Sequence, residues 1–397
     1  MDGLNRPYRR DRVTGLAVIF NSALTAFQVG LGAVMPIVRD NLGMSLSVAS
    51  LHFTIMAVFG MLSSHLTATV SRALGRRRTI LFSIGATGFG LLLFCAAPNV
   101  AISLLAAVVI GISGSFGVIA TQAEVFDHHR WHRATASAEL TLTVSAAMFI
   151  MTVGAAPLVS WTGSWRLVLL VPALISLGSF VVIGSIQFSD HARPRSGRSH
   201  GTMTPLAWLF CVLIIAQSAF EWCYGYLGAE FMDKAGGLSK SAAAAAMIFY
   251  YAGLVLGRML LLQAVRRFTS LQLLLTSFAT ASIGFLLLAA APATLVKCSG
   301  LFCSGLGISL TFPMISSLAA ASFPHATDWI LSRIYTAGGL AVAVAPFVIG
   351  TLGDVVGIGT SFWVVGLIGA LGLIATPLLI RVQVPGSFVD QDASAVP

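Results

Sequence analysis

The chain has 397 residues, of which 57% are hydrophobic and only 9% are charged. An ordinary soluble domain carries about 25% charged residues, so this composition excludes most soluble enzyme classes and predicts an all-α polytopic membrane protein. The formal net charge of +9 does not indicate nucleic-acid binding, because basic residues in a membrane protein mainly set its orientation.

Charge-poor apolar runs predict twelve membrane spans, since a helix needs about 20 apolar residues to cross a bilayer. Residues 79–123 are too long for one span, and Pro98-Asn99 predicts the turn that divides them. The first run is also too long for a signal peptide, so we expect it to be retained. In chain order, the spans are predicted at 13–38, 41–71, two within 79–123, 138–160, 166–187, 205–228, 241–264, 269–290, 294–322, 330–352 and 359–380.

Lysine and arginine are distributed unevenly over the predicted loops. With the N-terminus inside, the inner segments hold 16 of these residues and the outer loops hold 5, leaving aside Arg258 and Arg333, which lie in or beside spans. This bias predicts a multi-pass protein of the cytoplasmic membrane with both termini in the cytoplasm. The one sizeable polar linker, 188–204, predicts an N-terminal six-helix bundle at 1–187 and a C-terminal one at 205–397.

The two halves also resemble each other in sequence. A shift of 194 residues places Gly43–Ala49 on Gly237–Ala243, and a shift of 189 places Ala156-Pro157 on Ala345-Pro346. Ordered matches at a nearly constant offset indicate a duplication. Two six-span repeats are typical of transporters whose binding site lies at the repeat interface.

The predicted inner loop between the second and third spans carries a recognisable motif. It reads Ala68-Thr-Val-Ser-Arg-Ala-Leu-Gly-Arg-Arg-Arg78 and resembles the G-x-x-x-D-R-x-G-R-R pattern of the major facilitator superfamily. Gly75 and the basic run match, whereas Arg72 stands at the aspartate position. Trp165-Arg166 before the sixth span is also similar to this family. The resemblance implies two pseudo-symmetric six-helix bundles and secondary active transport by alternating access.

Glu221-Trp222 followed by Gly257-Arg258 resembles the members related to bacterial sugar (fucose-type) permeases. This second resemblance is looser than the first and does not name a substrate.

Ionisable groups inside a membrane cost about 2.5–3.5 kcal/mol each on insertion scales, so Glu221 and Arg258 mark candidate functional positions. Polar residues recur at i, i+4, i+7 in the seventh span and in the first span, its repeat counterpart; they are Gln217, Glu221 and Tyr224, and Asn21, Thr25 and Gln28. Each set lies on one helix face and predicts a polar path. Glu221 is predicted to carry a proton or to bind the substrate; the alternative is a structural hydrogen bond between spans.

Arg258 lies in the inner half of the eighth span, and Tyr251, seven residues earlier, lies on the same face. A guanidinium can bind a carboxylate through two parallel hydrogen bonds, which suggests a substrate site. Two alternatives stay open: Arg258 pairs with Glu221 of the neighbouring span, or it extends to the cytoplasmic surface.

Glu124 and Glu139 flank the predicted inner loop between the fourth and fifth spans. We expect them to pair with Arg72 or Arg76 and to close an inner gate; the alternative is ordinary solvated loop charge. The histidines of Asp127–His132 lack the spacing of a closed zinc site, so no metal and no cofactor are expected.

The chain contains no GxxxxGK[ST] segment, the phosphate-binding motif of nucleotide-driven proteins. We therefore predict a secondary transporter of a small organic solute, working as a monomer in the bilayer, with protons as the candidate coupling ion. The alternatives are drug or metabolite efflux and monocarboxylate exchange through Arg258. A membrane-embedded enzyme using Asp127 and His128 is a remote alternative, and a transport-inactive sensor ranks last.

Overall fold

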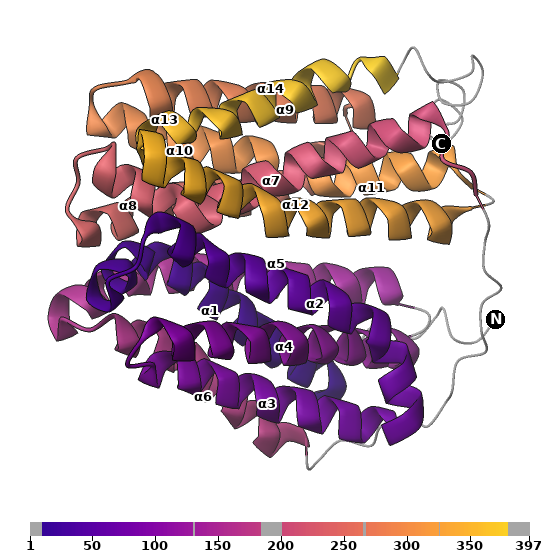
Figure 1. Cartoon of the computed structure of the whole chain (residues 1–397). Helices are drawn as coiled ribbons and strands as arrows, with labels where there is room; N and C mark the ends of the chain where they lie inside the picture. Colours follow the sequence, from indigo (N-terminus) through magenta and orange to yellow (C-terminus); the bar gives the residue numbers. More distant parts are fainter. Residues whose placement is uncertain (1–9, 130–131, 184–200, 265–266, 325, 380–397) are drawn as a thin grey trace. The chain divides into compact units, whose positions relative to one another are not determined.

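The structure is a computed structural model that describes residues 10–129, 132–183, 201–264, 267–324 and 326–379. All regular secondary structure in these ranges is helical (Figure 1). The helices are α1 Arg12–Leu42, α2 Leu46–Leu74, α3 Arg76–Ala96, α4 Val100–His128, α5 Arg133–Thr162, α6 Trp165–Ile183, α7 Pro205–Lys234, α8 Lys240–Ala264, α9 Ser270–Ala290, α10 Thr294–Ile308, α11 Thr311–Ser322, α12 Thr327–Val356, α13 Ile358–Ser361 and α14 Trp363–Ala375.

Eleven helical segments of the described chain are long and apolar enough to cross a membrane, and each coincides with a predicted span. The remaining prediction, 166–187, corresponds to α6, whose apolar part Trp165–Phe180 is shorter. That prediction extends past residue 183, outside the described ranges. The protein is therefore an all-α, multi-pass membrane protein.

Local sequence signals place several helix ends. The Asp11 carboxylate accepts a hydrogen bond from the Thr14 backbone N–H at 2.8 Å and caps α1. Asn99 caps α4 in the same way through Ile102, which confirms the turn predicted at Pro98-Asn99. Gly43 ends α1 with φ of 64°, a left-handed conformation that favours glycine.

One predicted span, 294–322, consists of two helices. α10 ends at Ile308 and α11 begins at Thr311. Pro313 explains the interruption, because proline has no N–H to donate to the carbonyl of Ser309 and its ring crowds that carbonyl. The span is still continuous as an apolar segment.

The chain forms two compact units. Unit 1 comprises Met1–Pro194, Gly225–Ile248 and Pro346–Ile358, and unit 2 comprises Arg195–Tyr224, Phe249–Ala345 and Gly359–Pro397. Helices α7, α8 and α12 thus contribute residues to both units. Much of the predicted linker 188–204 lies outside the described residues, so the division into halves at 187 and 205 stays a prediction.

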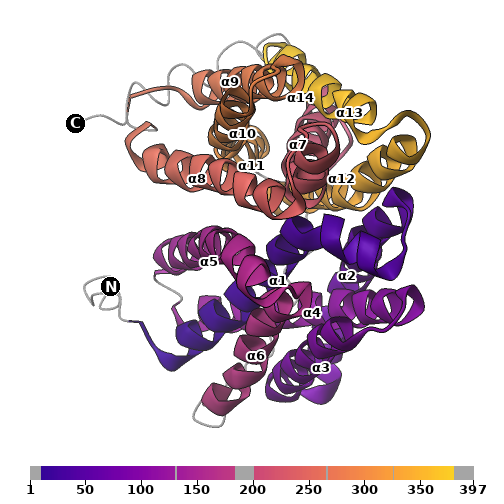
Figure 2. The same cartoon turned by 90° about the vertical axis from the view of Figure 1, so that its left-hand side faces the viewer.

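In unit 1, α1 packs against α4, α5 and α6, while α4 packs against α2 and α3 (Figure 2). Buried side chains of α1, α3, α4 and α5 form an apolar cluster that includes Phe20 and Ile84. Glycines allow close approach of the helices: a Cβ at Gly111 would collide with the Met56 backbone of α2.

In unit 2, α9 packs against α10, α11 and α14. A Cβ at Gly305 of α10 would collide with the backbone carbonyl of Tyr250 in α8, so these helices also approach at a small residue.

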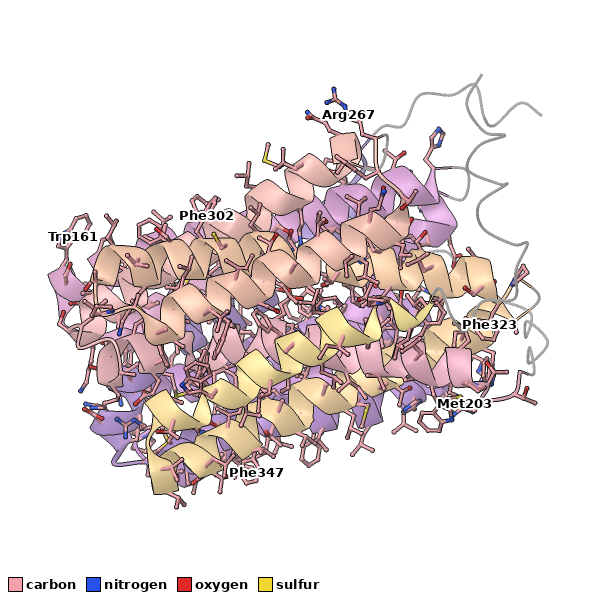
Figure 3. The ribbon with its side chains drawn as sticks, turned by 90° about the horizontal axis from the view of Figure 1, so that it is seen from above. Trp161, Met203, Arg267, Phe302, Phe323 and Phe347 are labelled. Atoms are coloured by element: carbon pink, nitrogen blue, oxygen red, sulfur yellow. The ribbon has the colours of Figure 1, made fainter. Side chains whose placement is uncertain are left out.

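Large apolar side chains project from the helix surfaces of both units, as Trp161 of unit 1 and Phe302 of unit 2 do in Figure 3. Trp161 is 82% exposed, which suits a surface in contact with lipid.

Candidate functional site

The centre of the candidate site is an ion pair between two apolar helices of unit 2. Nη2 of Arg258 in α8 lies 3.3 Å from Oε1 of Glu221 in α7. One turn earlier on α7, the Gln217 side chain donates a hydrogen bond from Nε2 to Oε2 of Glu221. Of the alternatives left open by the sequence, the structure therefore contains the Arg258–Glu221 pair.

The pair is not sealed from its surroundings. The side chains of Glu221 and Arg258 retain 15% and 24% of their exposure, although both lie within helices that can cross a membrane. A salt bridge of 3.3 Å is longer than the 2.7–2.9 Å of strong charge-assisted hydrogen bonds. The geometry thus leaves the guanidinium and the carboxylate open to other partners, such as a proton or an anionic group.

Ser218 holds Gln217 in position, because its hydroxyl donates to Oε1 of Gln217 at 2.9 Å. With Oε1 occupied as an acceptor, the amide directs its Nε2–H toward Glu221. The carboxylate of Glu221 thus receives one neutral and one cationic donor. Ser218 is absent from the sequence prediction because a single serine in an apolar run carries no distinctive signal.

Aromatic rings support the backbone around Glu221. The hydroxyl of Tyr250 donates to the main-chain carbonyl of Glu221 at 3.1 Å. The ring of Tyr250 stacks on that of Tyr224, with centroids 5.1 Å apart, and Tyr251 packs its edge against Tyr250. These tyrosines are buried, so they fix the helix that carries the carboxylate.

Two tyrosines of the predicted path have packing partners. The hydroxyl of Tyr224 accepts a hydrogen bond from Ser304 of α10 at 2.9 Å, and Tyr251 is only 2% exposed. The sequence favoured Tyr251 because it lies seven residues before Arg258, close to two full turns. Tyr250, which reaches Glu221, is offset by eight residues and was missed.

Asn21 and Gln28 lie in α1, within unit 1. Asn21 is 4% exposed, and neither polar atom of its amide has a hydrogen-bond partner among the described residues. A buried, unsatisfied amide costs about 1–3 kcal/mol, which suits a group that receives a ligand or a water molecule. Gln28 is half-buried.

Two of the predicted gate residues, Arg76 and Glu124, contact each other in unit 1. Nη1 of Arg76, at the start of α3, lies 2.8 Å from Oε2 of Glu124 and 2.7 Å from Oδ2 of Asp127, both in the last turns of α4. A cation at a helix start and an anion at a helix end each interact unfavourably with the helix dipole. Their pairing compensates both unfavourable placements.

Arg72 and Glu139 have other partners in the structure. Arg72 donates to the Thr69 hydroxyl at 3.5 Å in an exposed position, and Glu139 pairs with Nε of Arg10 at 2.9 Å. The four predicted gate residues are therefore not gathered in one cluster. Within the described chain, no group of three or more histidine, cysteine, aspartate or glutamate side chains is placed to hold a metal ion.

Comparisons with known proteins agree with this architecture. The family model described as Major Facilitator Superfamily matches residues 15–324. A curated relative, the uncharacterized transporter y4wD of Sinorhizobium fredii (strain NBRC 101917 / NGR234), is 24% identical over 210 residues, which cover 51% of this chain and 54% of that protein. The chain thus spans about half the length of the curated relative that it matches.

Solved structures show the same fold. A mutant form of the nucleoside transporter NupG matches with a TM-score of 0.77 at 10% identity, covering 93% of this chain and 98% of that one. A bacterial homolog of the human lysosomal transporter Spinster, in an inward-facing and unoccupied conformation, matches with a TM-score of 0.74 at 13% identity, covering 94% and 98%. At these identities the likeness concerns the fold alone.

Proposed function

The chain belongs to the major facilitator superfamily, and on this premise we propose that it moves a small organic solute across the cytoplasmic membrane by alternating access, with Glu221 as the proton-coupling carboxylate. The observation that carries the proposal is the Arg258–Glu221 pair inside two membrane-crossing helices. Charged groups at such depth are costly, and this pair is left partly open instead of being sealed by packing.

The chemistry of coupling follows from competition for the carboxylate. When Glu221 is ionised, Arg258 and Gln217 stabilise it. When Glu221 takes up a proton, it no longer attracts the guanidinium, and Arg258 becomes available to a solute anion. Binding of the proton and of the solute would thus favour each other, which is the requirement for coupled movement.

Monocarboxylate exchange is the second candidate, because Arg258 alone could bind the carboxylate of each exchanged solute. In an exchanger, the solute replaces Glu221 as the partner of Arg258 and no proton crosses the membrane. The cytoplasmic location of both termini and the monomeric state rest on the sequence and belong to the proposal.

The test uses purified protein in liposomes that contain a pH-sensitive dye. Pools of sugars, monocarboxylates and amphiphilic drugs are added, and wild type is compared with Glu221→Gln and Arg258→Gln. Arg267→Gln is the matched control, because Arg267 is an exposed arginine of unit 2 that projects from the surface in Figure 3.

We expect a solute-dependent proton flux in wild type and in Arg267→Gln, and its loss in Glu221→Gln. Solute movement without proton flux, retained in Glu221→Gln but lost in Arg258→Gln, would contradict proton coupling and favour solute exchange through Arg258. Solute movement retained in both site variants would contradict the assigned site.

A further inference from the structure

An exposed pair of aromatic rings lies in unit 2 and takes no part in the proposed coupling. Phe312 belongs to α11 and Tyr335 to α12, and both residues lie in unit 2. Their rings are parallel within 8°, and the ring centroids are 5.8 Å apart. Unlike the buried Tyr224 and Tyr250, these two residues are 40% and 50% exposed. A flat apolar surface is therefore open to a further ring, which can continue the stack.

Helix packing places Phe312 near the arginine of the transport site. Gly257, the neighbour of Arg258 in α8, packs against the end of α10, because a Cβ at Gly257 would collide with the hydroxyl of Ser309. Ser309 and Leu310 keep a right-handed helical backbone. Residues three apart in such a backbone lie on the same face, so Phe312 follows the contact beside Arg258 by about one turn.

A second contact brings Tyr335 to the other half of the site. A Cβ at Gly338 of α12 would lie 3.0 Å from the hydroxyl oxygen of Ser218 in α7. This serine donates to Gln217, and Gln217 in turn donates to Glu221. Tyr335 precedes Gly338 by three residues in the same helix, so it lies on the same face, about one turn away. Both rings are thus about one turn from contacts that adjoin the ion pair.

A buried polar atom accompanies the aromatic pair. Ser316 follows Phe312 by four residues in α11 and lies on the same face. Its hydroxyl oxygen is buried and has no hydrogen-bond partner among the described residues. Acyl chains cannot satisfy such a group, whereas water or a polar ligand can. This face of α11 is therefore suited to a ligand that combines an aromatic ring with polar atoms.

We propose that the solute is a small aromatic monocarboxylate, whose carboxylate binds Arg258 and whose ring stacks on Phe312 and Tyr335, a pair that we call the ring shelf. The inference rests on the proposed function and names the solute class of the same site. Charge supports a single carboxylate, because one guanidinium faces one carboxylate in the described site and protonation of Glu221 leaves one positive charge. Ligand sites commonly combine aromatic walls with a few polar groups that fix orientation.

The ring shelf selects a solute by shape and by electrostatics. Parallel rings favour a third flat ring, because offset stacking places the positive edge of one π system over the negative face of the next. A saturated ring with the same number of carbons is thicker and has no π system, so it gains only the burial of apolar area. A helical turn rises about 5.4 Å, which is comparable to the length of a benzoate ion, so one such ion can reach both the guanidinium and the ring shelf.

Binding can be measured independently of transport. Purified protein in lipid nanodiscs is equilibrated with radiolabelled benzoate, and unlabelled benzoate, cyclohexanecarboxylate and benzamide compete for the site. We expect benzoate to bind roughly tenfold more tightly than either competitor, because cyclohexanecarboxylate lacks the flat ring and benzamide lacks the charge. Equal competition by benzoate and cyclohexanecarboxylate would overturn the proposal, and so would the absence of saturable benzoate binding.

Substitutions at the ring shelf test its role directly. Phe312→Leu and Tyr335→Leu should each raise the dissociation constant of benzoate roughly fivefold and leave that of cyclohexanecarboxylate unchanged, which reports an intact fold. Tyr335→Phe keeps the ring and should bind benzoate as wild type does.

The matched control is Phe249→Leu. Phe249 is 43% exposed, belongs to unit 2 and precedes Arg258 by nine residues, which places it on the opposite face of α8. This variant should bind benzoate as wild type does. If the ring shelf were only an aromatic belt at the membrane surface, Phe312→Leu would behave like Phe249→Leu, and the proposal would be wrong.

The liposome assay separates this inference from the proposed function. Benzoate-driven proton flux that is lost in Glu221→Gln is the result expected if both hold. Flux driven by a sugar or an aliphatic acid, without benzoate binding, would overturn the ring shelf and leave the proposed function intact. Benzoate binding with the expected pattern of variants but without solute movement would contradict the proposed transport and support the assigned ligand class.

Discussion

Arg76 and Arg258 both pair with carboxylates, but their surroundings differ. Arg76 contacts two carboxylates at 2.8 and 2.7 Å, and the Glu124 side chain is 1% exposed. Nη2 of Arg258 lies 3.3 Å from Oε1 of Glu221, and the Glu221 side chain is 15% exposed. A short, sealed contact resists exchange of partners, whereas a longer and partly open one permits it.

The comparison separates two uses of the same chemistry. Arg76 joins the consecutive helices α3 and α4 within unit 1, which favours a structural role and leaves the predicted gate role as a prediction. Arg258 joins α8 to a carboxylate that is also held by Gln217, which favours a group that changes partners. The following variants test this separation.

The largest effect is expected for Arg76→Gln. The substitution removes the Arg76 guanidinium from Glu124, whose side chain is 1% exposed, and breaking a buried ion pair costs about 3–5 kcal/mol. The apparent Tm of the purified protein should fall by roughly 5 °C or more. Arg72→Gln is the control, because Arg72 is exposed and should change stability by no more than about 0.5 kcal/mol. Equal Tm values for the two variants would contradict the structural role assigned to Arg76.

A smaller effect is expected at the open pair. Arg258→Gln should cost about 1–2 kcal/mol, because Glu221 keeps Gln217 as a donor and is partly exposed. The double variant Glu221→Gln/Arg258→Gln should regain part of this loss, since no charge is left unpaired. Thermal unfolding of the four proteins of the cycle measures the coupling. Strictly additive losses would show that the two side chains do not interact.

Tyr224→Phe tests whether a ring beside the site acts in packing or in transport. Its hydroxyl accepts from Ser304 and its ring is buried, so the variant should lose about 1 kcal/mol and retain solute movement. Liposome uptake and thermal unfolding are measured on the same preparation. A loss of uptake without a loss of stability would place the Tyr224 hydroxyl on the solute path, as the sequence predicts.

The smallest effect is expected at Asp11, outside the spans. Burial raises the pKa of this carboxyl. Hydrogen bonds from Thr14 and the nearby His129 and His128 lower it by more than burial raises it, so the pKa lies below its usual value. A lowered folded-state pKa stabilises the fold above the unfolded-state pKa, and this contribution disappears as the pH falls through the folded-state value.

Asp11→Asn keeps a capping side chain and removes only the charge. It should cost about 0.5 kcal/mol at neutral pH, and the difference from wild type should shrink as the pH falls below the usual aspartate pKa of about 3.9. Thermal unfolding of both proteins across this range checks the sign. A difference that grows as the pH falls would contradict it.

Much of the fold was predictable from local signals. Apolar runs locate the spans because a backbone in lipid must satisfy its own hydrogen bonds, and helices do so. Pro98-Asn99 marked a helix boundary because asparagine caps the next helix. The apolar run 294–322 was predicted as one span, in which Pro313 should produce a kink. The structure goes further and divides the run into two helices at Ser309–Leu310.

The candidate site was predictable only in part. The shared face of Gln217 and Glu221 follows from helical periodicity, and the structure joins these two side chains. The choice between Tyr250 and Tyr251 depends on how α8 is rotated toward α7, and no local pattern records that rotation. Glu230 lies near the predicted end of a span, where a charge is common, so its burial against Arg39 gave no signal.

The sequence by itself determined the membrane class, the helices and the polar face of α7, because hydrophobicity and helical periodicity act over neighbouring residues. Only the tertiary structure decided that Arg258 meets Glu221 and that Arg39 meets Glu230. These partners lie 37 and 191 positions apart. Their contacts depend on the rotation, depth and close glycine packing of whole helices, and the free energy of those arrangements comes from many residues at once.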